Sequence, residues 1–189
     1  MPEYFLFLIL LIAAFSHAIC HSLLKHNKNP LGLLGIASIC EIIIFTPLVF
    51  FVPIPTTYIW ILIAISSLLH GLYRIMVLYS YRFGDLSFIY PVARGGSSLL
   101  LTIISIIYLT DRISLFGFLA ILIVCFGLFL ISYSKKNQFN KTAFALGLIT
   151  ALMITSYTLV DGIGIRHSEN AYTYLYWMLL LNGTPALIA

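Results

Sequence analysis

The sequence predicts an all-α fold, a polytopic transmembrane bundle of about seven helices. Three observations support this fold class. The chain of 189 residues is 61% hydrophobic and 8% charged, with a mean hydropathy of +1.07, whereas soluble domains average about 45–50% apolar and about 25% charged residues. The apolar residues form runs of about 20, the length that crosses a bilayer. Short polar turns separate these runs.

Each apolar run, taken in chain order, is long enough to span the hydrocarbon core. The runs are Tyr4–Leu24, Leu31–Val52, Thr57–Tyr81, Leu86–Leu109, Ser114–Ser134, Thr142–Ile163 and Ala171–Ala189. Lipid offers backbone groups no hydrogen-bond partner, so spans of this length must be helices. A transmembrane β-barrel would instead show segments of about ten residues with alternating polarity, and the sequence does not alternate in this way.

Turn-forming residues mark the boundaries between the runs. The separators are His26-Asn27-Lys28-Asn29-Pro30, Pro53-Ile54-Pro55, Arg82-Phe83-Gly84-Asp85, Thr110-Asp111-Arg112, Lys135-Lys136-Asn137-Gln138 and Arg166-His167-Ser168-Glu169-Asn170. Such short loops predict that successive helices pack as antiparallel neighbours. At the two ends of the chain, Glu3 argues against a signal peptide, which begins with positive charge. The last run has no polar flank after Ala189, so we expect a truncated or fragmentary sequence.

Lysine and arginine gather on one side of the predicted membrane. That side, after the first, third and fifth helices, holds Lys25, Lys28, Arg82, Lys135, Lys136 and Lys141. The opposite side holds Arg112 and Arg166. Because cytoplasmic loops carry the excess of positive charge, this count predicts an extracytoplasmic N-terminus.

Several function classes are not supported by the sequence. The net charge of +4 resides mostly in loops, without a basic stripe or stacking platform, so nucleic acid is not an expected partner. The cysteines lie inside apolar runs without CxxC spacing, which indicates packing residues. His17 and His21 have metal-ligand spacing but no third ligand, and no catalytic motif is present. We therefore expect no metal, no cofactor and no enzymatic activity.

Ionisable residues inside the spans are costly and usually functional. Arg74 and Arg94 lie on either side of one turn, each about 10–12 Å deep at 1.5 Å rise per residue. His17 and Glu41 lie at similar depths on either side of another turn at the same end. These residues are therefore predicted to share one layer, with His70 one helical turn deeper than Arg74.

This layer predicts a polar cavity with a net positive charge. We expect Arg74, Arg94, Glu41, His17 and Tyr90 to bind substrate, through guanidinium contacts to a carboxylate or phosphoryl group. Glu41, His17 and His70 are the candidates for proton coupling. The alternative is that Glu41 neutralises one arginine as a structural pair and that the histidines are packing residues.

Two further features concern the helices around this layer. Asp161, near the end of the sixth helix, is expected to make a helix-end or loop contact. The stretch Pro91–Ser98, with the glycine pair Gly95-Gly96, weakens the fourth helix beside buried charge. It indicates either a moving part of a substrate pathway or a plain packing groove.

The stretch Tyr79–Ser134 resembles the EamA-type repeat of the drug/metabolite transporter superfamily. The features that carry the resemblance are Gly84-Asp85, Tyr90-Pro91, Asp111-Arg112 and the glycine-rich helix from Gly117 to Gly127. The first helix, around Ala14–Lys25, is similar to the opening helix of that family. The resemblance implies a ten-helix fold of two inverted five-helix repeats, usually with cytoplasmic termini, which is opposite to the charge count.

An internal repeat agrees with this resemblance. Ala14–Leu24 aligns with Ala151–Asp161, and Thr46-Pro47 echoes Thr184-Pro185 one residue out of register. The resemblance then implies that residues 1–134 form the first repeat and that 142–189 begin an incomplete second repeat, with about three helices missing.

The expected function follows from the layer and the resemblance together. We expect a secondary carrier or exporter of small anionic or zwitterionic metabolites that works by alternating access, in the plasma membrane of a bacterium (the inner membrane). Its expected partners are the substrate, the lipid bilayer and a second copy in a homodimer. The alternatives are a lipid-linked sugar flippase of the same superfamily and a non-transporting membrane subunit.

Overall fold

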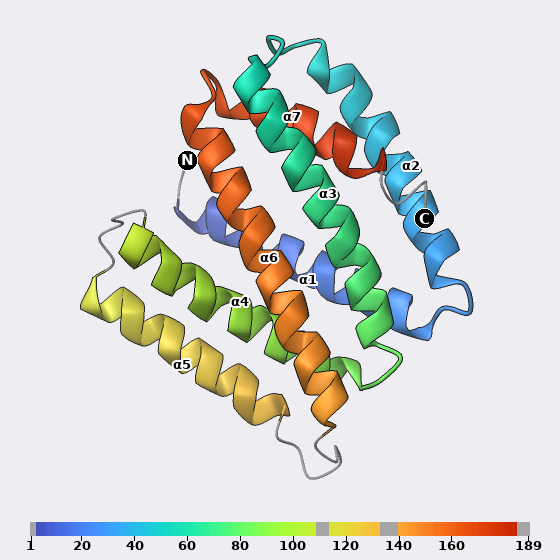
Figure 1. The fold of residues 1–189 in the computed structure, drawn as a ribbon, viewed down its shortest axis with the longest axis vertical. Helices are drawn as coiled ribbons and strands as arrows, with labels where there is room; N and C mark the ends of the chain where they lie inside the picture. The colour runs from blue at the N-terminus through green and yellow to red at the C-terminus, as the bar shows by residue number, and fades with distance from the viewer. Residues whose placement is uncertain (1–2, 109–113, 133–139, 185–189) are drawn as a thin grey trace.

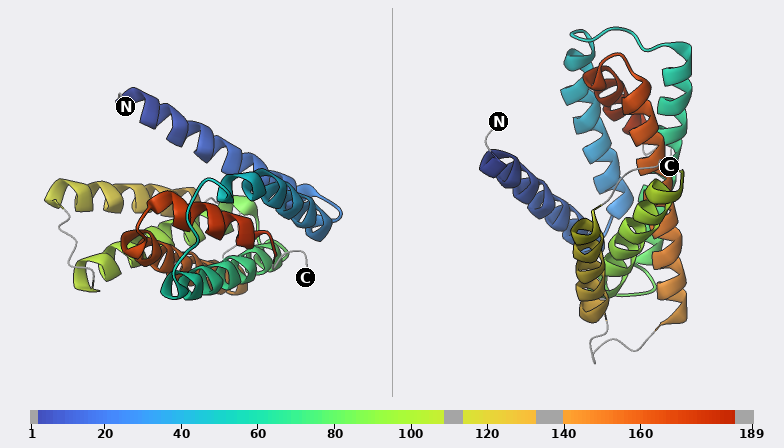
Figure 2. Two further views of the ribbon diagram at one scale, coloured as in Figure 1. Left: turned by 90° about the horizontal axis from the view of Figure 1, so that it is seen from above. Right: turned by 90° about the vertical axis from the view of Figure 1, so that its left-hand side faces the viewer.

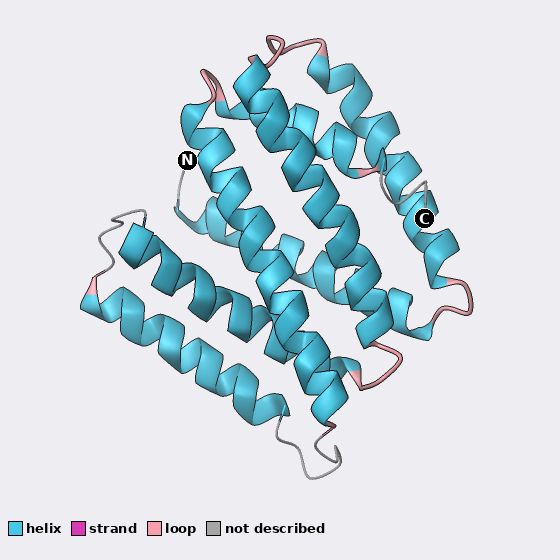
Figure 3. Cartoon of the chain, in the orientation of Figure 1, coloured by secondary structure: helices cyan, strands magenta, loops and turns pink. Residues whose placement is uncertain are grey.

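A computed structural model describes residues 3–108, 114–132 and 140–184, and within these ranges every regular element is an α-helix (Figures 1 and 3). The helices are α1 (Glu3–His26), α2 (Pro30–Val49), α3 (Thr57–Ser80), α4 (Leu86–Tyr108), α5 (Leu115–Ser132), α6 (Lys141–His167) and α7 (Ala171–Asn182). The predicted all-α fold is confirmed, and each predicted run overlaps one of these helices. The ends of three predicted runs, at 109, 133–134 and 185–189, lie outside the described residues.

Five helices are long and apolar enough to cross a membrane, as expected of a multi-pass membrane protein. These spans are Tyr4–His26, Pro30–Val49, Thr57–Ser80, Leu86–Ile107 and Lys141–His167. A helix of about 20 residues reaches about 30 Å, the thickness of the hydrocarbon core. The described apolar stretch of α5 is shorter, at Leu115–Leu130.

The burial pattern is that of a protein solvated by lipid. Large apolar side chains cover the outside, and Phe116 and Ile123 of α5 are 83% and 71% exposed. Small hydroxyl side chains lie inside, among buried apolar residues such as Ile63 and Ile89. The most buried of the hydroxyl side chains are Ser38, Ser66, Ser80, Thr150 and Thr155. Small residues of this kind allow transmembrane helices to approach closely, and their hydroxyls bond to backbone carbonyls of the same helix or to a neighbour.

Helix α6 is the centre of the bundle. It packs between α3 and α4, while α5 covers the other side of α4 and α7 packs against α2 and α3 (Figure 1). Helix α1 contacts α2 and α4 and otherwise projects from the body (Figure 2). Its side chains are exposed from Tyr4 to Cys20.

Glycines allow the close packing around α6. A Cβ on Gly147 would lie 2.8 Å from Cγ1 of Val92 in α4, and one on Gly164 would overlap the ring of Tyr174 in α7. A Cβ on Gly96 of α4 would lie 3.1 Å from the Cβ of Ala151 in α6. The glycine pair of α4 therefore contributes to a packing surface, which was one of its two predicted roles.

The loops divide between two ends of the bundle. Lys25 Nζ donates to the carbonyl oxygens of Tyr81 and Gly84, the latter at 2.9 Å, and Asn140 Nδ2 donates to Phe83 O at 2.8 Å. These contacts bring the end of α1, the α3–α4 turn and the start of α6 together. We call this end the basic end, because Lys25, Arg82 and Lys141 lie there. At the opposite end the rings of Tyr58 and His167 are 5.8 Å apart.

Candidate functional site

Polar side chains form one face of α3, at spacings of three and four residues. The face contains Ser66, His70, Tyr73 and Arg74. Residues at these spacings lie on the same side of a helix. The contacts described below show that this side turns toward α2, α6 and α7, so the polar groups point into the bundle.

Arg74 is paired with Glu41 of α2. Its Nη2 donates to both carboxylate oxygens, at 2.7 and 2.8 Å, and its Nη1 donates to Ser38 Oγ at 3.2 Å. Charge-assisted bonds from one guanidinium to one carboxylate are strong and directional. Glu41 and Arg74 therefore meet in one layer, as predicted, and form the ion pair that was the structural alternative for them. A role in binding substrate stays a prediction for both.

Arg94 of α4 has a different environment. Its guanidinium lies 5.7 Å from the ring centroid of Tyr90, and its buried Nε has no hydrogen-bond partner. Among the described residues, the ion pairs inside the bundle are Arg74–Glu41 and His70–Asp161, so no carboxylate neutralises Arg94. The predicted pair of substrate-binding arginines thus consists of one neutralised and one unneutralised guanidinium.

Aromatic and histidine side chains surround Arg94 in a small pocket. The ring of His21 is 5.0 Å from that of Tyr90, and a hydrogen bond of 2.9 Å joins His21 Nδ1 to the hydroxyl of Tyr81. Tyr73 also lines the pocket. The cavity between these side chains has room for about one water molecule.

His17 lies at the edge of this group. Its ring stacks with that of His21 at a centroid distance of 6.4 Å, but its side chain is exposed on α1. His17 therefore neighbours the pocket without lining it. The exposure of His17 follows from α1, which projects from the rest of the bundle.

A second polar group surrounds Asp161 of α6. Its Oδ1 accepts hydrogen bonds from the hydroxyls of Ser66 and Tyr174, the latter at 2.9 Å, and its Oδ2 lies 4.0 Å from His70 Nε2. The expectation of a helix-end or loop contact for Asp161 is wrong, because this side chain contacts α3 and α7 inside the bundle. The predicted layer contained two arginines and one glutamate, and Asp161 adds a second carboxylate. Among the described residues, the positive charge without a carboxylate partner is therefore that of Arg94.

Tyr157 connects the two polar groups. Its ring stacks on His70 at a centroid distance of 3.8 Å and meets the ring of Tyr73 edge-on at 5.5 Å. Tyr157 thus lies beside His70 of the Asp161 group and beside Tyr73, which lines the Arg94 pocket. The depth count did not include Tyr157 or Tyr174. The sequence signal for Tyr157 is its spacing of four residues from Asp161, which puts two polar side chains on one face of α6.

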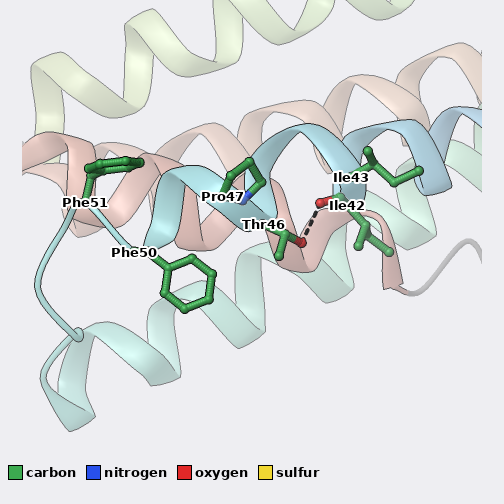
Figure 4. A pocket seen from close by; sticks show the side chains of 6 residues that line it. All are labelled: Ile42, Ile43, Thr46, Pro47, Phe50 and Phe51. Carbon is green, nitrogen blue, oxygen red and sulfur yellow. Dashed lines mark hydrogen bonds between the residues drawn. The ribbon is translucent and has the colours of Figure 1, made fainter.

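A separate groove on α2 differs in chemistry from these groups. Thr46 Oγ1 donates to Ile42 O at 2.6 Å beside Pro47, and the groove of about 570 Å³ has almost entirely apolar walls (Figure 4). Its rim contains Phe50 and Phe51, which are 82% and 83% exposed. Such a surface suits lipid chains and offers no group to select a polar solute.

The described residues contain no group of three or more His, Cys, Asp or Glu side chains that could hold a metal ion. His17 and His21 therefore have no third ligand in this part of the chain. Comparison with known proteins gives no match to a protein-family model, to a curated protein or to a solved structure.

Proposed function

We propose that this chain is the transport body of a secondary carrier for small anionic or zwitterionic metabolites, with Arg94 as the anchor for the anionic group. The observation that carries the proposal is the unneutralised guanidinium of Arg94 inside a membrane span. A charged side chain at this depth costs a few kcal/mol, which a structural role alone does not require.

The chemistry around Arg94 fits a carboxylate or phosphoryl group. A guanidinium presents parallel N–H donors that match two oxygens of such a group. The hydroxyls of Tyr73 and Tyr90 add donors beside it. Asp161, beside His70 in the second polar group, would accept the ammonium group of a zwitterion. Amino-acid-like solutes therefore combine the features that the two polar groups recognise.

Alternating access explains why the pocket is small in this conformation. With space for about one water, it must open before a metabolite can enter. Helix α4 is suited to that motion, because Pro91 lacks an N–H for the helical ladder and lies one turn from Arg94. Movement of α4 against α6 would widen the pocket without breaking the Arg74–Glu41 pair.

A proton is the coupling ion that we propose. The Nδ1 atom of His70 lies 3.0 Å from Ser66 O, a contact in which it donates its proton. The lone pair of Nε2 then faces Asp161 Oδ2 at 4.0 Å, so a proton added there forms an imidazolium–carboxylate pair. Of the predicted candidates, His70 has the geometry for this role, while Glu41 is held by Arg74.

The family and the membrane belong to the same proposal. The likeness of Tyr79–Ser134 to the EamA-type repeat supports a ten-helix carrier of two inverted repeats, the first at 1–134 and the second begun at 142–189. Carriers of this kind would reside in the plasma membrane, here the bacterial inner membrane. A homodimer is the proposed assembly.

Uptake into proteoliposomes tests the proposal. The purified protein would be reconstituted and offered labelled amino acids, dicarboxylates, sugar phosphates and organic cations. We expect uptake of an anionic or zwitterionic solute, at least a tenfold lower rate for Arg94→Gln, and an intermediate rate for Arg94→Lys, which keeps the charge but loses the fork. Uptake of cations alone, or full activity of Arg94→Gln, would overturn the proposal.

One observation favours a lipid-linked sugar flippase as the second candidate. Helix α1 packs lightly on the bundle, and its exposed His17 neighbours His21 in the wall of the Arg94 pocket. A lipid-linked phosphate could therefore reach Arg94 sideways from the bilayer. Translocation of a polyprenyl-phosphate-linked sugar between leaflets, with no uptake of soluble solutes, would support this candidate over the first.

A further inference from the structure

A second polar cavity lies at the basic end, between the ends of three helices. Its volume is about 400 Å³, within the range of ligand sites. It is formed by the end of α1, the start of α2 and the end of α3. No residue of the Arg94 pocket lines it except Tyr81, whose backbone carbonyl is capped by Lys25.

The polar wall of this cavity is positively charged. Lys25, Lys28 and Arg82 line it, and no carboxylate is among its lining residues. Lys25 donates to two backbone carbonyls, which fixes its position but leaves its charge unneutralised. Lys28 and Arg82 are exposed and have no ion-pair partner among the described residues. The cavity therefore presents two free cationic groups beside a fixed one.

The other wall is apolar. Leu31, Ile75 and Tyr79 are 48%, 45% and 48% exposed, and Leu24 and Leu78 complete this wall. The cavity lies at the end of the spanning segments of α1, α2 and α3, which is the level of the lipid headgroups. A ligand here would meet cations on the side of the headgroups and apolar side chains on the side of the acyl chains.

We propose that this cavity binds the phosphate headgroup of an anionic phospholipid, with its acyl chains along Leu31 and Ile75. Basic pockets between transmembrane helices suit anionic headgroups, and each nearby lysine or arginine adds to the attraction. A soluble phosphate would use the cations but leave the apolar wall exposed. The three cationic side chains favour a lipid with a net negative charge over a zwitterionic lipid. This inference is independent of the proposed transport function.

The lipid would join helices that otherwise have few contacts. Lys25 belongs to α1, Lys28 to the α1–α2 turn and Arg82 to the α3–α4 turn. One headgroup bridging them would hold α1, which projects from the body, against the start of α2 and the end of α3. Binding to the folded protein stabilises it by an amount that grows with the logarithm of the ratio of the lipid concentration to the dissociation constant.

The test is binding of short-chain lipids to the purified full chain in neutral detergent, followed by native mass spectrometry and thermal unfolding. The probes are dioctanoyl phosphatidylglycerol, dioctanoyl phosphatidylcholine and soluble glycerol 3-phosphate. The variant is the double substitution Lys28→Gln and Arg82→Gln, which spares the Lys25 cap. Lys141→Gln is the matched control, because Lys141 is an exposed cation at the same end that does not line the cavity.

We expect phosphatidylglycerol to bind and raise the unfolding temperature, and to bind about tenfold more weakly to the double variant but unchanged to the Lys141→Gln control. Equal binding of phosphatidylcholine would mean that the apolar wall alone recruits lipid. Equal binding of glycerol 3-phosphate would mean a site for free phosphate esters. Either result, or unchanged binding to a double variant that unfolds at the wild-type temperature, would overturn the proposal.

Discussion

The two arginines inside the bundle illustrate how a side chain's neighbours decide its role. Arg74 shares two hydrogen bonds with Glu41, and Arg94 has no carboxylate partner among the described residues. Counting from the α3–α4 turn predicts a similar depth for both, so distance along the chain does not distinguish them. The difference comes from Glu41, which α2 presents to α3 and not to α4.

The Arg74–Glu41 pair is predicted to be structural. Glu41→Gln leaves Arg74 partly buried without its counter-charge, and we expect the free energy of unfolding to fall by about 1–3 kcal/mol. The double variant Glu41→Gln with Arg74→Gln should recover part of this loss, because it removes the unpaired charge. Unfolding in detergent, arranged as a double-mutant cycle, measures the coupling. Additive single effects would show that the pair contributes nothing to stability.

Proton coupling is predicted to depend on His70 and Asp161. The groups that face His70 are Asp161 and Tyr157 from α6, Arg74 from α3 and Glu41 from α2. If a proton at His70 Nε2 drives transport, the rate of wild-type uptake should change between about pH 5 and 8. In the His70→Gln variant, the rate of uptake should be constant over this pH range.

The matched control for this prediction is Ser66→Ala. It removes the hydroxyl that donates to Asp161 and lies 3.2 Å from His70 Nδ1, but it removes no titratable group. Its rate should stay pH-dependent, even if slower. A pH-dependent rate in both His70→Gln and Asp161→Asn, together with normal expression, would move the coupling role away from this pair.

The meeting of Glu41 and Arg74 was predictable from their positions along the helices, but rotation about each helix was not. Counting from the turns correctly brought Glu41 to Arg74, because rise per residue is constant. It did not show that Asp161 faces Ser66 and Tyr174, since that depends on which side of α6 packs against α3 and α7. The exposure of His17 depends likewise on the angle of α1.

The contact between helices α6 and α7 depends on the glycine at position 164, because a side chain there would meet Tyr174. A Cβ on Gly164 would overlap the buried ring of Tyr174, whereas Gly162 has open space around its Cα. Both glycines lie in the same helix, two residues apart. They therefore form a matched pair for testing how tightly α7 is docked.

Gly164→Ala is predicted to destabilise the protein by about 1–3 kcal/mol, since overpacking forces Tyr174 or α7 to move. Gly162→Ala should be neutral or stabilising by up to about 1 kcal/mol, because alanine favours the helix. Denaturation in detergent measures both variants under one condition. Equal stability of the two would show that α7 is not packed against Gly164 as described.

The helices themselves were predictable because their length and apolar composition are strong signals. The third run was expected at Thr57–Tyr81 and is observed at Thr57–Ser80. The fourth was expected at Leu86–Leu109 and is observed up to Tyr108, the last described residue there. The expectation that successive helices pack side by side holds for α4 and α5 but is wrong for α3 and α4, because each of these two packs against α6 instead.

For the whole molecule, exposed apolar side chains and buried hydroxyl groups indicate that lipid is the solvent. They do not indicate which end of the bundle faces the cytoplasm. The positive-inside rule predicts that the basic end is cytoplasmic and that the N-terminus is outside. The resemblance to EamA-type carriers implies the opposite orientation for the N-terminus.

Labelling of single cysteines would decide between these orientations. Cys20, Cys40 and Cys125 would first be replaced by alanine, so that the introduced cysteine is the one that reacts. One cysteine would then be introduced at a time, at exposed loop positions of the two ends. The substitutions are Lys28→Cys and Asp85→Cys at the basic end, and Ile54→Cys and Glu169→Cys at the opposite end.

A membrane-impermeant maleimide added to whole cells should label Ile54→Cys and Glu169→Cys and leave the other two unlabelled until the cells are opened. Labelling of Lys28→Cys and Asp85→Cys alone would reverse the orientation and agree with the family resemblance. Both outcomes keep the fold, because α1–α3 and α3–α6 contacts place each pair at one end. Labelling of Lys28→Cys together with Ile54→Cys, but not Asp85→Cys, would contradict the described arrangement, since α2 would then not cross the membrane.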